Sequence, residues 1–176
     1  MLLTPEEYDV RFDELQKVRI ELDEDPVANG LASINKKIAQ LQGQKDRVGK
    51  LLLEAIKNKT EAQLILDANK SAYERELDKL LATDVEVQNQ KNEKSRTAVA
   101  NTKVSEHVLQ THYAENDFTT ADAYYKCVQQ IYTNLESVNS NLSRQISVVQ
   151  MGMQIGEVTR TDLGDLFGKK MKLGGS

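Results

Sequence analysis

The chain has 176 residues, enough for one domain of moderate size, with a formal net charge of −4 and a single cysteine, Cys127. An intramolecular disulfide is therefore excluded, and the acidic balance gives no general signal for nucleic acid. The chain lacks Trp, has only two Pro, and is 28% charged and 39% hydrophobic. Few aromatic residues and few helix breakers favour long, thin helices, and the regular apolar spacing argues against disorder.

The cellular compartment is predicted from what the sequence lacks. The first residues have neither the basic start nor the apolar run of a signal peptide. No stretch approaches the roughly 18 consecutive apolar residues that a membrane span needs. These features predict a soluble, cytoplasmic protein without a membrane partner.

The first predicted helix begins at Thr4-Pro5-Glu6-Glu7, which is a capping box with Pro at the first helical position. Apolar residues then recur every three or four positions, at Tyr8, Phe12, Leu15, Val18 and Leu22. We expect this helix to end near Asp25-Pro26, with Asn29-Gly30 reinforcing the break.

The second predicted helix is the longest and follows a heptad pattern in steps of four and three. Ten of its fourteen seam positions are apolar. They are Ile34, Ile38, Leu41, Lys45, Val48, Leu52, Ala55, Lys59, Ala62, Leu66, Asn69, Tyr73, Glu76 and Leu80. The polar positions among them can fix the register or face acids of a neighbouring helix.

Beyond this helix, Thr83-Asp84 is interpreted as a cap or kink. Residues 88–97 contain no apolar side chain and are either a solvated helix or a flexible connection. We favour the helix, because the segment lacks Gly and Pro. Residues 116–120 are interpreted as a turn before a new helix. The seam of that last helix comprises Ala121, Tyr125, Val128, Tyr132, Leu135, Asn139, Leu142, Ile146, Val149 and Met153.

These elements predict an all-α protein, an elongated antiparallel helical bundle or coiled coil of three to four helices. We expect an N-terminal helix within residues 1–25, a coiled-coil bundle over 26–160 and a flexible or amphipathic tail over 161–176. The seams can close within one chain or between copies, so a homo-oligomer is expected.

No enzyme motif is present, and we predict a non-enzymatic protein without cofactor, metal or small-molecule substrate. His107 and His112 are five residues apart and point in different directions on a helix, so they do not form a local metal site. Cys127 lies beside the seam and is interpreted as an inert thiol.

The candidate nucleic-acid-binding residues form a basic stripe on the second helix, opposite its apolar seam. Lys36, Arg47, Lys50 and Lys57 fall within about 80° of one another in helical projection, as a row that tracks phosphates would. The alternative is a solvated face that pairs with acids of the first helix. Lys91, Lys94 and Arg96 form a second patch with the same two interpretations.

The tail carries a candidate partner-binding motif, formed by Asp162, Leu163, Asp165, Leu166 and Phe167. It resembles the short peptide by which DNA-metabolism proteins dock onto bacterial sliding clamps, although Asp162 replaces the usual leading Gln. The same residues suit an amphipathic helix that folds onto the bundle.

Two segments resemble the recombination mediator family of T4-like phages, the UvsY family. One is Leu80-Leu81-Ala82-Thr83-Asp84-Val85-Glu86-Val87, similar to that family's L-x-x-D-x-x-V turn. The other runs from Tyr125 to Ser143-Arg144-Gln145-Ile146. Known members are shorter and more basic. The resemblance implies a helical, ring-forming protein, phage-encoded and active in the host cytoplasm, that binds single-stranded DNA and helps load a recombinase. Only Arg144 is then implied as a DNA contact.

The sequence thus supports two functional hypotheses. One is an oligomeric accessory protein in DNA transactions that binds single-stranded DNA and replication or recombination proteins. The alternative is a structural or adaptor coiled coil, such as a virion, tail or secretion component or a chaperone, without nucleic-acid binding.

Overall fold

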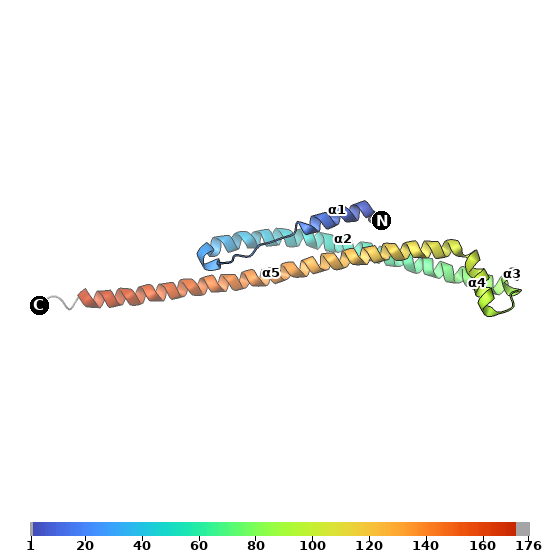
Figure 1. The fold of residues 1–176 in the computed structure, drawn as a ribbon. Coiled ribbons are helices and arrows are strands. Elements are labelled where there is room, and N and C mark those ends of the chain that lie inside the picture. Colours follow the sequence, from blue (N-terminus) through green and yellow to red (C-terminus); the bar gives the residue numbers. More distant parts are fainter. Residues whose placement is uncertain (1, 172–176) are drawn as a thin grey trace. The chain divides into compact units, whose positions relative to one another are not determined.

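The computed structural model describes residues 2–171, and the side chains up to Ile155. This part of the chain is helical and contains no β-strand, which confirms the all-α prediction. The helices are α1 (Pro5–Gln16), α2 (Pro26–Thr83), α3 (Val85–Gln88), α4 (Glu93–Lys103) and α5 (Ser105–Met171) (Figure 1). The chain forms two compact units, which share α2 and α5. The first contains residues up to 17 and 48–130, and the second contains 18–47 and the chain from 131 onward.

In the first unit, α1 packs on α2 and α5 through aromatic side chains. The predicted capping box is present, since the Thr4 side chain accepts from Glu7 N and the Glu7 side chain accepts from Thr4 N. Tyr8 and Phe12 place their rings edge-on to the fully buried Tyr124, with centroids 5.4 and 5.7 Å away. These contacts fix the apolar face of α1 against α5.

The predicted seams form the core between the antiparallel helices α2 and α5. In the first unit, Val48, Ala55 and Ala62 of α2 are buried, as are Ala121 and Val128 of α5. These positions are seven residues apart within each helix, which is the spacing of a coiled-coil core. Small residues at these positions allow the two helix backbones to lie close together.

The predicted turn at residues 116–120 is wrong, because α5 continues through it. Thr119 and Thr120 donate their hydroxyls to the carbonyls of Glu115 and Asn116, 2.7 and 3.0 Å away, so they do not cap a new helix. Ala114 and Ala121 are both buried on either side. The core seam is therefore uninterrupted, and its burial outweighs the weak helix propensity of Asn and Thr.

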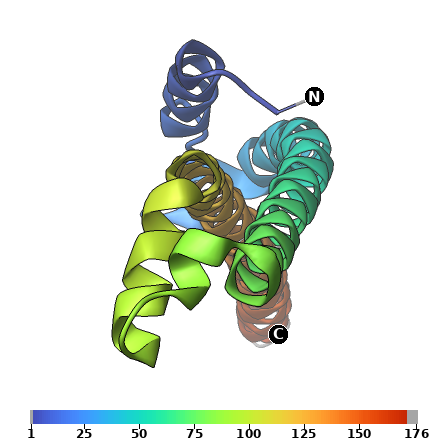
Figure 2. The same cartoon turned by 90° about the vertical axis from the view of Figure 1, so that its right-hand side faces the viewer.

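Residues 88–97 form a corner and only in part the predicted helix. Asp84 caps α3 by accepting from Glu86 N and Val87 N, as the cap interpretation of Thr83-Asp84 predicted. Residues 89–92 are not helical, and Asn92 caps α4 by accepting from Ser95 N at 2.8 Å. The corner faces the viewer in Figure 2. Asn92 offers the backbone a cap, and capping competes with helix at such positions.

In the second unit, α2 begins at Pro26 and bends at Gly30, whose φ of 72° is the left-handed conformation that glycine tolerates best. Beyond this bend Ile34 and Leu41 are buried, as are Leu142 and Val149 of α5. The two helices are again antiparallel, since Val27 packs near Gly152 and Lys45 near Glu136.

The first helix ends at Gln16 and does not reach Asp25, which corrects the predicted boundary. Residues 18–25 of the second unit are extended, and their carbonyls bond to side chains of α2 and α5. Lys37 Nζ donates to Glu21 O at 2.7 Å, and Gln145 Nε2 donates to Asp23 O at 2.7 Å. Tertiary hydrogen bonds thus replace the helical ones that the apolar spacing at Val18 and Leu22 predicted.

α5 includes residues 161–171 of the predicted tail. The side chains of the clamp-like motif, Asp162 to Phe167, lie outside the described ones. None of the helices, over the residues that were placed, has a stretch apolar and long enough to span a bilayer.

Candidate nucleic-acid interface

Seven of the eight lysines of α2, together with Arg47, fall into two groups on opposite sides of the helix. The eighth, Lys79, lies on the outer side and pairs with Glu76 of the same helix at 3.1 Å. The inner lysines, Lys37, Lys45, Lys59 and Lys70, flank the core seam. The outer bases, Lys36, Arg47, Lys50 and Lys57, are all exposed, as the stripe predicted. Because both groups come from one helix, comparing their partners tests whether the outer bases belong to the internal ion pairs.

Each inner lysine has an acidic partner within its own unit. In the first unit, Lys59 pairs with Asp122 at 2.7 Å and Lys70 with Glu115 at 3.2 Å. In the second unit, Lys37 pairs with Asp23 at 2.9 Å and Lys45 with Glu136 at 4.0 Å.

Aromatic rings and carboxylates hold the inner lysines further in place. Lys59 Nζ lies 4.6 Å from the centroid of the Tyr125 ring, and Lys45 Nζ lies 5.5 Å from that of Tyr132. Hydrogen bonds from Lys126 and Lys59 lower the pKa of the Asp122 carboxyl. The inner lysines are therefore engaged in the fold itself.

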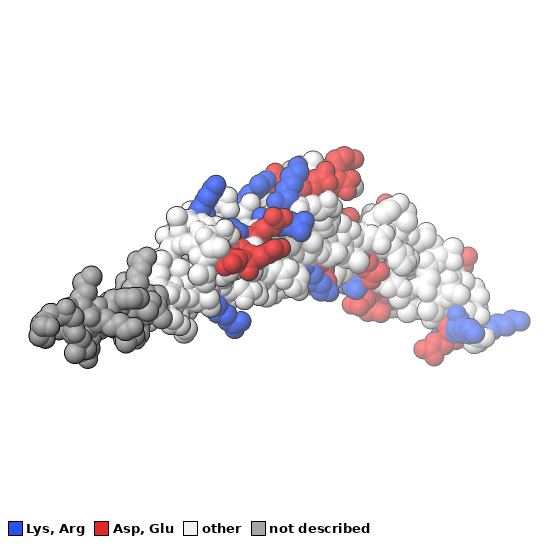
Figure 3. Space-filling view, turned by 60° about the vertical axis from the view of Figure 1, so that its left-hand side comes forward, with Lys and Arg blue, Asp and Glu red and all other residues white. Residues whose placement is uncertain are grey.

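The outer lysines differ, since Lys36, Lys50 and Lys57 form no ion pair with any residue that the structure places. Arg47 is also exposed, but it interacts with another residue and is not counted with these three lysines. Acids and bases alternate over the face drawn in Figure 3. Phosphate-binding positions on this face are therefore expected as short local groups.

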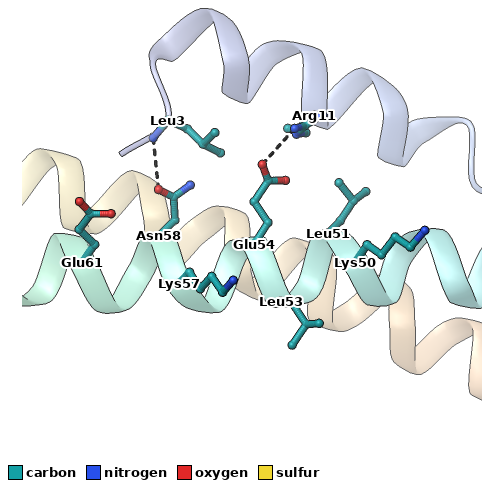
Figure 4. A pocket seen from close by; sticks show the side chains of 9 residues that line it. All are labelled: Leu3, Arg11, Lys50, Leu51, Leu53, Glu54, Lys57, Asn58 and Glu61. Atoms are coloured by element: carbon teal, nitrogen blue, oxygen red, sulfur yellow. Dashed lines mark hydrogen bonds and ion pairs between the residues drawn. The ribbon is translucent and has the colours of Figure 1, made fainter. Parts of the chain in front are cut away.

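In the first unit, Lys50 and Lys57 line a groove of about 630 Å³ between α1 and α2 (Figure 4). Arg11 donates to Glu54 at 3.0 Å across the groove, and this hydrogen bond raises the pKa of Arg11. Asn58, at 4% exposure, accepts from Leu3 N at 3.2 Å. The Arg11–Glu54 pair and Asn58 thus fasten the N-terminal segment, and the two lysines remain at the solvent edge.

In the second unit, Lys36 and Arg47 line two adjoining hollows of about 440 Å³ each. Both hollows include Arg19, Ile20 and Gln40. We call them together the Arg19 groove, which runs between residues 19–21 and α2. Arg19 and its partner Glu21 are 3.9 Å apart and more than 80% exposed, so this ion pair is weak.

The remaining predicted residues do not line either groove. Lys91, Lys94 and Arg96 are exposed at the α3–α4 corner, where Arg96 Nε donates to Gln90 O at 3.4 Å. Arg144 is exposed on α5 in the second unit. The acids Asp162 and Asp165 and the apolar residues Leu163, Leu166 and Phe167 lie where no side chain is described.

Sequence reasoning missed two basic residues. Arg19 lines the second-unit groove but lies in the segment that was predicted to be helical. Arg75 is exposed on α2 and lies 18 residues, or five full turns, beyond Lys57. Helical projection alone identifies Arg75, whereas Arg19 is recognised only once its segment folds against α2.

The chain was compared with known protein families, curated proteins and solved structures. No family model, curated protein or solved structure gives a significant match to the chain.

Proposed function

We propose that the protein is a non-enzymatic helical accessory factor that binds single-stranded DNA along the outer face of α2 in replication or recombination. The observation that carries this proposal is the division of the α2 lysines. The inner lysines pair with acids, whereas Lys36, Lys50 and Lys57 have no acidic partner in the described chain. The alternative interpretation was a solvated face that pairs with acids of the first helix. It predicts an acidic partner for each of these three lysines, and none of them has one in the described chain.

The spacing of the exposed lysines suits a flexible strand. Lys50 and Lys57 are seven residues apart, about 10 Å along a helix axis. That distance corresponds to about three nucleotides of a stacked strand. Each neutralised phosphate releases condensed counterions, so a few contacts give binding that weakens steeply with salt.

The resemblance to phage recombination mediators supports the same assignment. Its L-x-x-D-x-x-V segment is a capped corner, in which Asp84 caps α3 and Val87 is fully buried. We also propose that the protein acts as a homo-oligomer with replication or recombination proteins. Leu53 and Leu64 of α2 are 62% and 65% exposed and offer apolar surface for such partners.

The test compares two triple variants with the same change in net charge. The outer variant carries Lys36→Gln, Lys50→Gln and Lys57→Gln, and the control carries Lys45→Gln, Lys59→Gln and Lys70→Gln. Fluorescence anisotropy with a labelled oligothymidylate measures the affinity at several salt concentrations, after circular dichroism has confirmed helicity.

The outer variant should lose affinity, and the magnitude of its slope in log affinity against log salt should fall by about 2, for three lost phosphate contacts. The control should keep the slope of the natural protein. Equal losses in the two variants would show that net charge alone governs binding and would refute the assignment to the outer face.

The adaptor function is the second candidate, and the exposed apolar side chains favour it. Ile56 and Leu64 line a hollow of about 440 Å³ beside Tyr125, where a partner helix could pack. An absence of DNA binding at low salt, together with a stable complex that Leu64→Asp disrupts, would favour the adaptor over the DNA accessory.

A further inference from the structure

Gly43 lies within the long helix α2, and nothing in the described fold requires a glycine at this position. It lies on the exposed side of α2 in the second unit, among residues with helical backbone. A Cβ added there would meet no atom within 4 Å. Glycine in a helix interior lowers stability relative to alanine, so an unneeded glycine at this position is unfavourable for folding alone.

The other two glycines of α2 differ from Gly43, since Gly30 has a special backbone angle and Gly49 is only partly exposed, beside the buried Val48. Gly30 adopts a left-handed φ of 72°. On the facing stretch of α5, a Cβ added to Gly152 would lie 3.7 Å from Val27 Cγ1, so a small side chain there would pack against α2 at an ordinary van der Waals distance. Gly43 has neither a special backbone angle nor a neighbour that its missing side chain accommodates. Its effect is to leave the backbone of α2 uncovered.

The uncovered backbone forms part of the Arg19 groove. Gly43 lines it with Arg19 and Gln40, and Lys36 lines the adjoining hollow. Guanidinium, ammonium and amide groups are donors, and all three bind phosphate oxygens. No aromatic side chain lines the groove, and its larger apolar residue is Ile20. The lining is suited to a sugar–phosphate backbone and offers no platform for base stacking.

We propose that the Arg19 groove seats the sugar–phosphate backbone of single-stranded DNA directly against α2 at Gly43. This inference rests on the proposed function and assigns it a particular site. Arg19 and Lys36 bind phosphates on either side of the point of closest approach, and Gln40 donates between them. The absent side chain at Gly43 lets the strand enter the groove, as glycines do where a backbone approaches a ligand closely.

The lining favours DNA over an acidic protein segment as the occupant. Protein interfaces obtain most of their affinity from aromatic or aliphatic anchors that fill pockets. The apolar lining of the Arg19 groove consists of Ile20 and Ala39, beside polar or charged side chains that include one carboxylate, Glu21, in its weak pair with Arg19. A phosphate backbone, by contrast, needs only donors and access.

The experiment uses the full chain and measures anisotropy of a labelled 30-nucleotide oligothymidylate. Gly43→Leu fills the groove, whereas the control Ala123→Leu adds the same side chain at an exposed site of α5 outside both grooves. A second variant, Arg19→Gln with Lys36→Gln, removes the two charges without adding bulk. Circular dichroism and thermal unfolding check the fold of each variant.

We expect Gly43→Leu to melt at or above the natural temperature and yet to weaken DNA binding roughly tenfold, a loss of two phosphate contacts at moderate salt. Ala123→Leu should bind within about twofold of the natural protein. The double variant should reduce the magnitude of the salt slope by about 1.4. These results together support the seat at Gly43.

Other outcomes overturn the inference, and they separate it from the proposed function. If Gly43→Leu and the double variant bind DNA as tightly as the natural protein, the Arg19 groove is not the DNA site, and the proposed function stands without it. If the natural protein fails to bind at low salt, both are refuted. If an oligoglutamate of matched charge displaces the DNA at equal concentration, the groove selects acidic chains in general and the DNA-specific seat is refuted.

Discussion

Tyr124 is predicted to be the anchor that holds α1 on the first unit. Its side chain is fully buried, and the rings of Tyr8 and Phe12 pack edge-on against it. Truncating a buried aromatic side chain to Ala lowers stability by about 3–5 kcal/mol, and each edge-to-face pair contributes about 0.5–1.5 kcal/mol of such a loss. We therefore expect Tyr124→Ala to lower the free energy of unfolding by about 4 kcal/mol.

The hydroxyl of Tyr124 gives a second, finer test of the same packing. It is buried without a hydrogen-bond partner among the described groups, and burial raises the pKa of Tyr124 to about 12. Removing an unpartnered buried hydroxyl relieves its desolvation penalty. Tyr124→Phe should therefore keep the natural stability or increase it by about 1 kcal/mol.

Urea unfolding followed by circular dichroism measures both variants. The matched control is Tyr113→Ala, because Tyr113 is the same residue type on the same helix and is 60% exposed. It should change the free energy of unfolding by less than about 0.5 kcal/mol. Equal losses for Tyr113→Ala and Tyr124→Ala, or a loss of several kcal/mol for Tyr124→Phe, would refute the described packing.

Three further predictions concern the second unit. Gly30→Ala should lower the free energy of unfolding by about 1 kcal/mol, because the φ of Gly30 is 72°. Gly43→Ala should raise the free energy of unfolding by about 0.5–1 kcal/mol, because alanine favours a helix and meets no neighbour there. Thermal unfolding measures both variants, and a change of the same sign in the two would contradict this prediction. The hydrogen bond from Lys37 lowers the pKa of Asp23, so its stabilisation is present above the unfolded carboxyl pKa near 4 and is lost as pH falls through the folded value. Urea midpoints between pH 6 and pH 2 should therefore fall less for Asp23→Asn than for the natural protein, and parallel curves would exclude Asp23 as the titrating group. Leu142→Ala should lower the unfolding free energy by about 2–5 kcal/mol because Leu142 is fully buried, and a loss below 1 kcal/mol in urea unfolding would argue against the seam.

The core of the fold could be predicted because it follows a simple period. The apolar residues of α2 and α5 recur in steps of three and four, and the positions seven apart, such as Val48 and Ala55 or Val128 and Leu135, are buried. The start of α1 was also predictable from sequence, since a capping box involves only residues three apart. Both signals are local in the chain, so they do not depend on how distant segments meet.

The end of α1 was not predictable from the same kind of signal. Residues 18–25 keep helical apolar spacing, but the carbonyls of Glu21 and Asp23 accept from Lys37 and Gln145. One of these donors lies 122 residues away in sequence. The competing hydrogen bonds are visible only when α2 and α5 are in place.

The candidate site could be predicted only in part, because one of its residues depends on contacts between segments far apart in the chain. The outer bases on α2 could be found because helical geometry alone separates them from the seam. Arg19 could not be found in this way, because it lies beside Lys36 only when the extended segment replaces the predicted helix. The helix through residues 116–120 was missed for a different reason. Asn and Thr there suggested a turn, although His107, Thr111, Ala114 and Phe118 already continue the seam rhythm into Ala121.

The most direct test of the central claim is the affinity of the natural protein for a labelled single-stranded oligonucleotide at increasing salt. We expect binding at micromolar or lower protein concentration at low salt, with an affinity that falls linearly on a log–log plot against salt. Its slope should be about −2 or steeper, for three or more neutralised phosphates. No binding at low salt, or an affinity that salt leaves unchanged, would exclude phosphate binding by the outer face of α2 and favour a protein partner there.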